Sequence, residues 1–189
     1  AEFLAIPSVS TESRYTKDVE RCAKWLAEHL SDAGVNTVEV IPTDGKPFVV
    51  AEHIVNPDLP TLLIYGHYDV QPVDPEELWD SPPFEATVRD GKVFARGSND
   101  DKGQVHMHIK ALEARLRTGL GMPVNVKLVI EGEEEIGSVH LESFLRENSQ
   151  RLACDAVVIS DTGMLGPDLP SIGVGLRGLA YMEIQVDGP

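Results

Sequence analysis

Two side chains that can bind a metal ion follow directly on the apolar segment 62–65. This segment is short and rich in apolar residues, which predicts a buried strand. Gly66 allows the backbone to turn, and His67 and Asp69 come next, two positions apart. In extended backbone, side chains at positions i and i+2 point to the same side. His67 can therefore bind a cation, while Asp69 either accepts a hydrogen bond from the second ring nitrogen or binds the cation beside it.

Acidic side chains recur at the ends of two more predicted strands and at the start of a predicted helix. They are Glu133, Glu134 and Glu135 after the strand 124–130, Asp161 after the strand 156–159, and Asp100 and Asp101 before a helix from about 104 to 116. Because ligands of open parallel sheets bind beyond the carboxyl ends of the strands, these groups are expected to meet in one place. Each group alone also suits a plainer role, as a solvated acidic turn, a helix-capping pair or a turn residue.

A cluster of one imidazole and several carboxylates indicates a particular kind of ligand. Several carboxylates buried together would be strongly unfavourable unless cations neutralised them. Nitrogen and oxygen donors suit zinc or manganese, and the cluster lacks the sulfur donors of structural zinc sites. His106 and His108 are not expected to bind one ion together, because a spacing of two turns them about 200° apart on a helix. We expect one of this pair to face the core and the other to be exposed.

Strands and helices alternate along the chain, which predicts an α/β domain with a mainly parallel twisted sheet flanked by helices. Strands are expected over 35–41, 48–55, 62–65, 124–130 and 156–159. A first helix is expected to follow the polar segment 7–12 and to stop at about 33, with Gly34 as its left-handed cap, and further helices over about 104–116 and 138–147. Hairpins are expected within 86–94 and over 172–186. The irregular segment 70–95 is long for a connection inside a compact domain, which is typical of a functional loop.

Composition limits the classes of partner. The chain has 189 residues, of which 42% are hydrophobic, enough for one domain with a core or for one domain and the start of a second. Its net charge of −15 argues against nucleic acid or an anionic membrane as partner. No apolar run approaches the length of a membrane span, and no signal peptide is expected from the first residues. Cys22 and Cys154 lie far apart, which predicts free thiols in a reducing compartment and hence a cytoplasmic protein.

Four motifs carry a family resemblance. They are Gly66-His67-Tyr68-Asp69-Val70-Gln71-Pro72, Arg96-Gly97-Ser98-Asn99-Asp100-Asp101-Lys102-Gly103, Glu134-Glu135-Ile136-Gly137-Ser138 and Ile159-Ser160-Asp161. In order and spacing, along essentially the whole chain, they resemble the dinuclear metallopeptidase family, whose members include carnosinase-type dipeptidases, peptidase T, acetylornithine deacetylase and succinyl-diaminopimelate desuccinylase. The first two motifs, with the segment 79–84, are more similar to the carnosinase-like dipeptidases than to the deacylases.

The resemblance implies a set of metal ligands. His67 and Asp161 would bind one divalent ion, Asp100 would bridge two, and Glu135 would bind the second. Zinc is the expected metal, with manganese or cobalt as alternatives. The resemblance also implies a cis peptide bond between Asp100 and Asp101.

The catalytic roles follow from the same resemblance. Asp69 would orient the ring of His67, and Glu134 would be the general base that takes a proton from a metal-bridging water and passes it to the leaving amine. The implied reaction is hydrolysis of dipeptides or short peptides, as a dipeptidase or carboxypeptidase. An N-acyl amino acid deacylase is the alternative, because the same metal site serves both reactions.

Domain organisation is also implied by the resemblance. Residues 1–186 would be the N-terminal part of a catalytic metal-binding domain, and 187–189 the junction to a lid domain that this chain lacks. A returning segment with the last histidine of the second metal site would be missing too. We therefore expect this chain alone to bind metal but to be inactive, and the full-length protein to be a homodimer formed through the lid.

Overall fold

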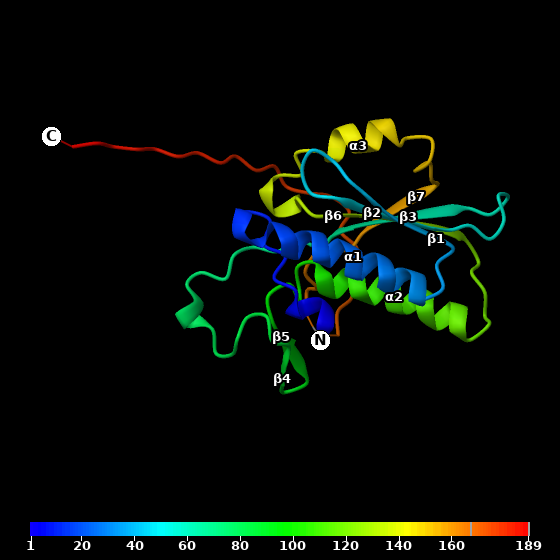
Figure 1. Ribbon diagram of the computed structural model, residues 1–189, viewed down its shortest axis with the longest axis horizontal. Helices are drawn as coiled ribbons and strands as arrows, with labels where there is room; N and C mark the ends of the chain where they lie inside the picture. The colour runs from blue at the N-terminus through cyan, green and yellow to red at the C-terminus, as the bar shows by residue number, and fades with distance from the viewer. Residues whose placement is uncertain (167, 189) are drawn as a thin grey trace.

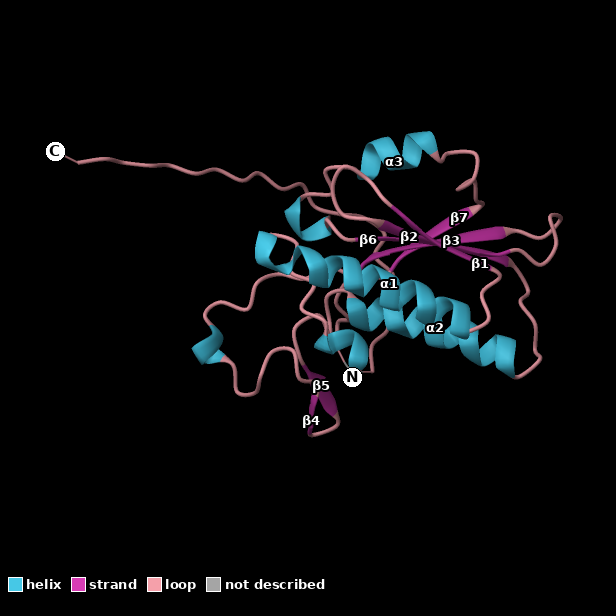
Figure 2. Ribbon diagram, viewed as in Figure 1, coloured by secondary structure: helices cyan, strands magenta, loops and turns pink. Residues whose placement is uncertain are grey.

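The computed structural model describes residues 1–166 and 168–188. It shows a five-stranded sheet with helices on both faces (Figure 1). Helices α1 (Thr16–Asp32) and α2 (Lys102–Arg117) cover one face, and α3 (Leu141–Glu147) covers the other (Figure 2). The prediction of an α/β domain is confirmed.

Strand order places three parallel strands side by side. The order is β1 (Thr37–Ile41), β2 (Phe48–His53), β6 (Asn125–Glu131), β3 (Thr61–His67) and β7 (Ala156–Ile159). Strands β6, β3 and β7 run parallel, whereas β1 and β2 add an antiparallel hairpin at one edge. The carboxyl ends of the three parallel strands therefore lie at the same edge of the sheet, where ligands of such sheets bind.

Apolar side chains on both faces of the sheet hold the helices in place. Helix α1 buries one stripe completely: Val19, Cys22, Ala23, Leu26 and Leu30. Strand β2 is buried on both sides, because Val49 and Ala51 join this core while Phe48 stacks on Phe144 of α3 with ring centroids 4.0 Å apart. Gly34, with φ of +96°, takes the left-handed conformation predicted for the end of α1.

The smaller elements follow the predictions with some shifts. The hairpin within 86–94 is formed by β4 (Thr87–Arg89) and β5 (Lys92–Phe94). The described part of the chain also contains four 3-10 helices: η1 (Glu2–Ala5), η2 (Ser13–Tyr15), η3 (Glu76–Leu78) and η4 (Glu134–Ile136). Helix α3 begins three residues later than predicted, because Gly137 and Ser138 have positive φ and cannot belong to a right-handed helix. None of the helices in the described ranges is long and apolar enough to cross a membrane.

The hairpin predicted over 172–186 is wrong for this structure. Residues 171–188 form neither helix nor strand and extend away from the sheet (Figure 1). Apolar side chains of this segment are open to solvent, with Val174 100% and Leu176 97% exposed. An isolated hairpin is marginally stable in water, and within the described residues no element packs on this one.

Candidate metal centre

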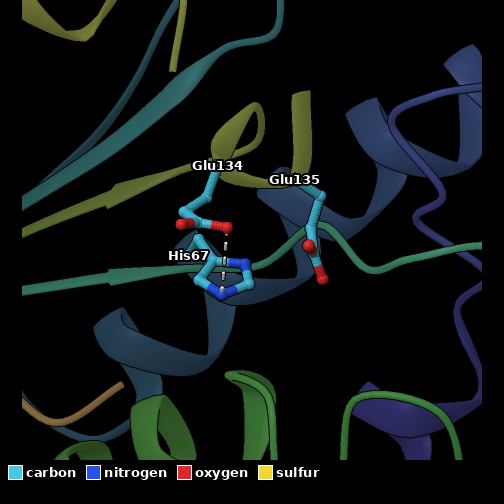
Figure 3. Close-up of side chains that lie close together, drawn as sticks. All are labelled: His67, Glu134 and Glu135. Carbon is cyan, nitrogen blue, oxygen red and sulfur yellow. Dashed lines mark ion pairs between the residues drawn. The ribbon is translucent and has the colours of Figure 1, made fainter. Parts of the chain in front are cut away.

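The predicted site residues meet at the carboxyl ends of the parallel strands. His67 is the last residue of β3, and Asp161 comes two residues after β7. Glu134 and Glu135 form the first turn of η4, which follows β6, and Asp100 stands just before α2. In Figure 3 the carboxylate of Glu134 faces the imidazole of His67, and Glu135 lies beside them.

Donor atoms of these residues form two groups that share one imidazole. His67 groups with Asp100 and Asp161, and again with Glu134 and Glu135, with all donor atoms of each group within 4.8 Å of one another. The Nε2 atom of His67 is 3.1 Å from Asp100 Oδ1, 3.6 Å from Asp161 Oδ2 and 4.0 Å from Glu134 Oε2. Two adjoining donor groups with a common residue are an arrangement that can hold one or two cations.

The electrostatics of the cluster fit a divalent cation. Burial is the main cause that raises the pKa of Glu134, Glu135 and Asp161, and neighbouring carboxylates raise it further. Burial alone would lower the pKa of His67, but the hydrogen bond and charge of Asp69 raise it to about 10. The negative charges of these carboxylates are therefore unfavourable in this place unless a cation neutralises them. One imidazole nitrogen surrounded by carboxylate oxygens suits zinc, manganese or cobalt.

Asp69 lies behind the imidazole and not among the donors. It is fully buried, and its Oδ1 is 3.3 Å from Nδ1 of His67, so Nε2 is left to face the other carboxylates. The same carboxylate accepts hydrogen bonds from the backbone N–H groups of Glu134, at 3.3 Å, and Glu135, at 3.2 Å. Asp69 therefore connects the ring of His67 with the turn that carries both glutamates. Of the two positions that the sequence left open for Asp69, the structure has the one beside the second ring nitrogen.

Substitution of Asp69 by asparagine is expected to weaken zinc binding by about 10- to 100-fold, the usual cost of losing a partner that orients metal ligands. Asparagine keeps one acceptor oxygen, but its NH2 group would face N–H groups that are themselves hydrogen-bond donors. The free energy of unfolding should fall by about 1–3 kcal/mol, because a buried donor loses its acceptor. Zinc titration and urea unfolding measure the two effects. Asp58→Asn, on an exposed loop, is the matched control; unchanged zinc affinity in Asp69→Asn would contradict the orienting role.

Contacts at the start of α2 hold Asp100 in place. The peptide bond between Asp100 and Asp101 is cis, as predicted. Asp101 is 1% exposed, and its Oδ2 accepts a hydrogen bond from the backbone N–H of His67 at 3.1 Å. Lys102 is fully buried and donates hydrogen bonds to two backbone carbonyls of the N-terminal segment. The segment that carries Asp100 is thus attached both to β3 and to the start of the chain.

Glu133 does not join the cluster, although it stands in the same acidic run. Its Oε1 accepts a hydrogen bond from the backbone N–H of Lys46 at 3.0 Å, and its Oε2 lies 2.7 Å from Nδ1 of His140. His140 therefore has a partner that its sequence context did not suggest. Glu133 ties the turn between β1 and β2 to the site and leaves Glu134 and Glu135 to face His67.

Two supporting residues were missed by the sequence reasoning. Gln71 donates a hydrogen bond to Glu135 Oε2 at 2.6 Å. Glu131, fully buried at the end of β6, accepts hydrogen bonds from Tyr65 Oη at 2.5 Å and from Ser138 Oγ at 2.9 Å. A charged residue directly after the apolar run 128–130 was the available signal for Glu131. Nothing comparable marks Gln71, whose partner lies 64 positions away.

A separate cavity lies within the long loop that was predicted to be functional. It has a volume of about 340 Å³ and is lined by residues of 73–98, including Trp79, Arg89 and Phe94. None of the residues grouped around His67 lines it. The loop is therefore hollowed at a place distinct from the candidate metal centre.

Comparisons with known proteins give a consistent result. The model of peptidase family M20/M25/M40 matches residues 63–187. The chain is 36% identical to the Cys-Gly metallodipeptidase dug1 of Schizosaccharomyces pombe, over 98% of this chain and 42% of that protein. It is 35% identical to the human Beta-Ala-His dipeptidase, over 98% of this chain and 39% of that protein. The M20 family metallo-carboxypeptidase Sso-CP2 of Sulfolobus solfataricus matches with a TM-score of 0.78 and 40% identity, over 86% of this chain and 36% of the other. The chain thus spans less than half the length of these relatives.

Proposed function

Because the chain belongs to the peptidase family M20/M25/M40, we propose that the protein hydrolyses peptide bonds in dipeptides or short peptides in a metal-dependent reaction. The observation that carries the proposal is the pair of donor groups that share His67. Substrates of this class are supported by two relatives, whose names describe dipeptidases for Cys-Gly and for Beta-Ala-His.

The proposed metal content is two divalent ions, zinc in the first place and manganese or cobalt as alternatives. His67 and Asp161 would hold one ion, Asp100 would bridge both, and Glu135 would hold the second. The group of His67, Asp100 and Asp161 supports the first ion, and the place of Glu135 in the adjoining group supports a second one beside it. Such ions, when bound, lower the pKa of a coordinated water and polarise a scissile carbonyl.

Glu134 is the proposed general base. Its Oε2 lies 4.0 Å from Nε2 of His67, at the centre of the cluster, and its side chain is 36% exposed. A carboxylate that is close to the metal ligands and still reachable from solvent can take the proton of an attacking water and deliver it to the leaving amine. Asp69 fixes the backbone of Glu134 and the ring of His67 for this step.

The cellular setting is also part of the proposal. A cytoplasmic location is supported by Cys22 and Cys154, which are both free. We expect neither nucleic acid nor membrane as a partner, in keeping with the net charge of −15. Residues 1–186 would be part of the catalytic domain. For a protein of the relatives' full length, we propose a homodimer formed through the lid domain implied by the family resemblance.

A direct test measures metal content and substrate preference together. Elemental analysis after dialysis without chelator is expected to find one or two zinc or manganese ions per chain. A protein of the relatives' full length should then cleave a panel of dipeptides, Cys-Gly and β-Ala-His among them, faster than N-acetyl amino acids. Faster cleavage of the acetylated compounds would favour the deacylase, and a protein that retains no metal would contradict the proposed centre.

A further inference from the structure

Asp161 is placed by a strand that gives it little support. Strand β7 is an edge of the sheet, and among the described residues it pairs with β3 alone. The pairing ends where Tyr65 meets Ile159, two residues before Asp161. Side chains of β7 are loosely packed as well, with Val157 53% and Ile159 58% exposed. Neither the strand ladder nor the core therefore fixes the position of Asp161.

A hydrogen bond from α2 reaches the residue just before Asp161. Nε2 of His108 and Oγ of Ser160 lie 2.7 Å apart, and which of them donates depends on the tautomer of the ring. The backbone carbonyl of Ser160 accepts a hydrogen bond from the N–H of Thr162, also at 2.7 Å. Ser160 is thus held by its side chain and by its carbonyl group, which limits the directions that the next side chain can take.

The same helix positions the other side of the cluster. Asp100 and Asp101 directly precede α2, and His108 lies about two turns further along it, roughly 9 Å at 1.5 Å per residue. A helix of this length is rigid over two turns, so it sets the spacing between Asp100 and the end of β7. The two carboxylates that approach Nε2 of His67 most closely, those of Asp100 and Asp161, are therefore both attached to α2.

We propose that His108 is a positioning residue, which holds Asp161 in the donor group of His67 and Asp100 through its hydrogen bond to Ser160. This inference rests on the proposed metal centre, and the ligand it serves is a divalent cation. His106, two positions away on the same helix, offers a contrast. It stacks on His29, and within the described residues its Nδ1 is buried without a hydrogen-bond partner and no hydrogen bond joins it to Ser160.

The test is a zinc titration of this chain against a competing chelator. His108→Ala and Ser160→Ala are each expected to weaken zinc binding by about 10- to 100-fold, the range for partners of metal ligands. The double variant should lose no more than either single one, because both remove the same hydrogen bond. His108→Gln, whose amide nitrogen reaches close to the position of Nε2, should restore most of the affinity. Urea unfolding of each metal-free variant shows whether the fold is retained.

His106→Ala is the matched control, since it removes an imidazole of similar exposure from the same helix. It should keep the zinc affinity of the wild type. Wild-type affinity in His108→Ala, or an equal loss in His106→Ala, would overturn the positioning role while leaving the metal centre intact. A wild-type chain that binds no zinc would overturn the proposed centre itself, and the inference with it. Measurement of the wild type therefore separates the two failures.

Discussion

In a protein of the relatives' full length, replacement of Glu134 by glutamine is expected to slow dipeptide hydrolysis by about 10²- to 10⁴-fold, the contribution of a positioned general base. Glutamine keeps the size of the side chain and its backbone hydrogen bond to Asp69, but it cannot accept the proton of the attacking water. Zinc affinity should remain close to that of the wild type, because the proposed ligands are other residues. Turnover of a dipeptide by the metal-loaded protein and a zinc titration measure the two quantities.

Glu147→Gln is the control for the loss of one negative charge, because Glu147 is exposed on α3, remote from His67. Two results would contradict the assignment of Glu134. Near-normal turnover in Glu134→Gln would show that another group takes the proton. A loss of zinc that matches the loss of turnover would make Glu134 a metal ligand and not the base.

The parts of the site that could be predicted are those fixed by short-range pattern. Apolar segments such as 62–65 form strands in the centre of the sheet, and parallel strands bring their carboxyl ends together. His67, Asp161 and the acidic run after β6 were therefore expected in one place before any contact was known. The spacing of two between His67 and Asp69 was equally informative, because it limits where the second side chain can lie.

Contacts between distant segments could not be predicted. The turn at Gly137 and Ser138, both with positive φ, is part of what directs Glu134 and Glu135 towards His67, while Glu133 reaches the backbone of Lys46, 87 positions away. No periodicity in the sequence distinguishes these three adjacent glutamates. His108 is a similar case, because its partner Ser160 lies 52 positions away on a different element.

In the segment 172–186, the local sequence pattern predicts a structure that is not formed. Its alternation of apolar and polar residues is typical of strands, and local pattern alone predicts a hairpin there. Whether strands form depends on a neighbour that supplies backbone partners and an apolar face. In the described residues this neighbour is missing, so Val174 and Leu176 stay exposed. Pattern indicates which segments are able to pair, and the surroundings decide whether they do.

Replacement of His67 by alanine is expected to weaken zinc binding more than the loss of a residue that only orients a metal ligand. Such an orienting residue contributes about 10- to 100-fold to metal affinity. His67 supplies the nitrogen donor of both groups and is a proposed ligand of one ion, so its removal takes a ligand atom directly from that ion. The loss also leaves Asp69 buried without the imidazole that it contacts at 3.3 Å. Zinc titration measures the effect, and it should exceed those of Asp69→Asn and His108→Ala.

His53→Ala is the matched control, because it also removes an imidazole, a partly buried one, at the end of a strand. Strand β2 runs antiparallel to β6, so His53 lies near the start of β6, away from the carboxyl ends of the parallel strands. Metal-free protein adds a second comparison. The pKa of His67 is raised from 6.5 to about 10, so its charge stabilises the fold fully below pH 6.5 and progressively less as the pH rises towards 10. His67→Ala should lose this part of the pH dependence of unfolding, whereas His53→Ala should keep it. Zinc affinity in His67→Ala within about tenfold of the wild type would place the metal elsewhere, because the loss of a direct ligand must cost more than the loss of a residue that only orients one.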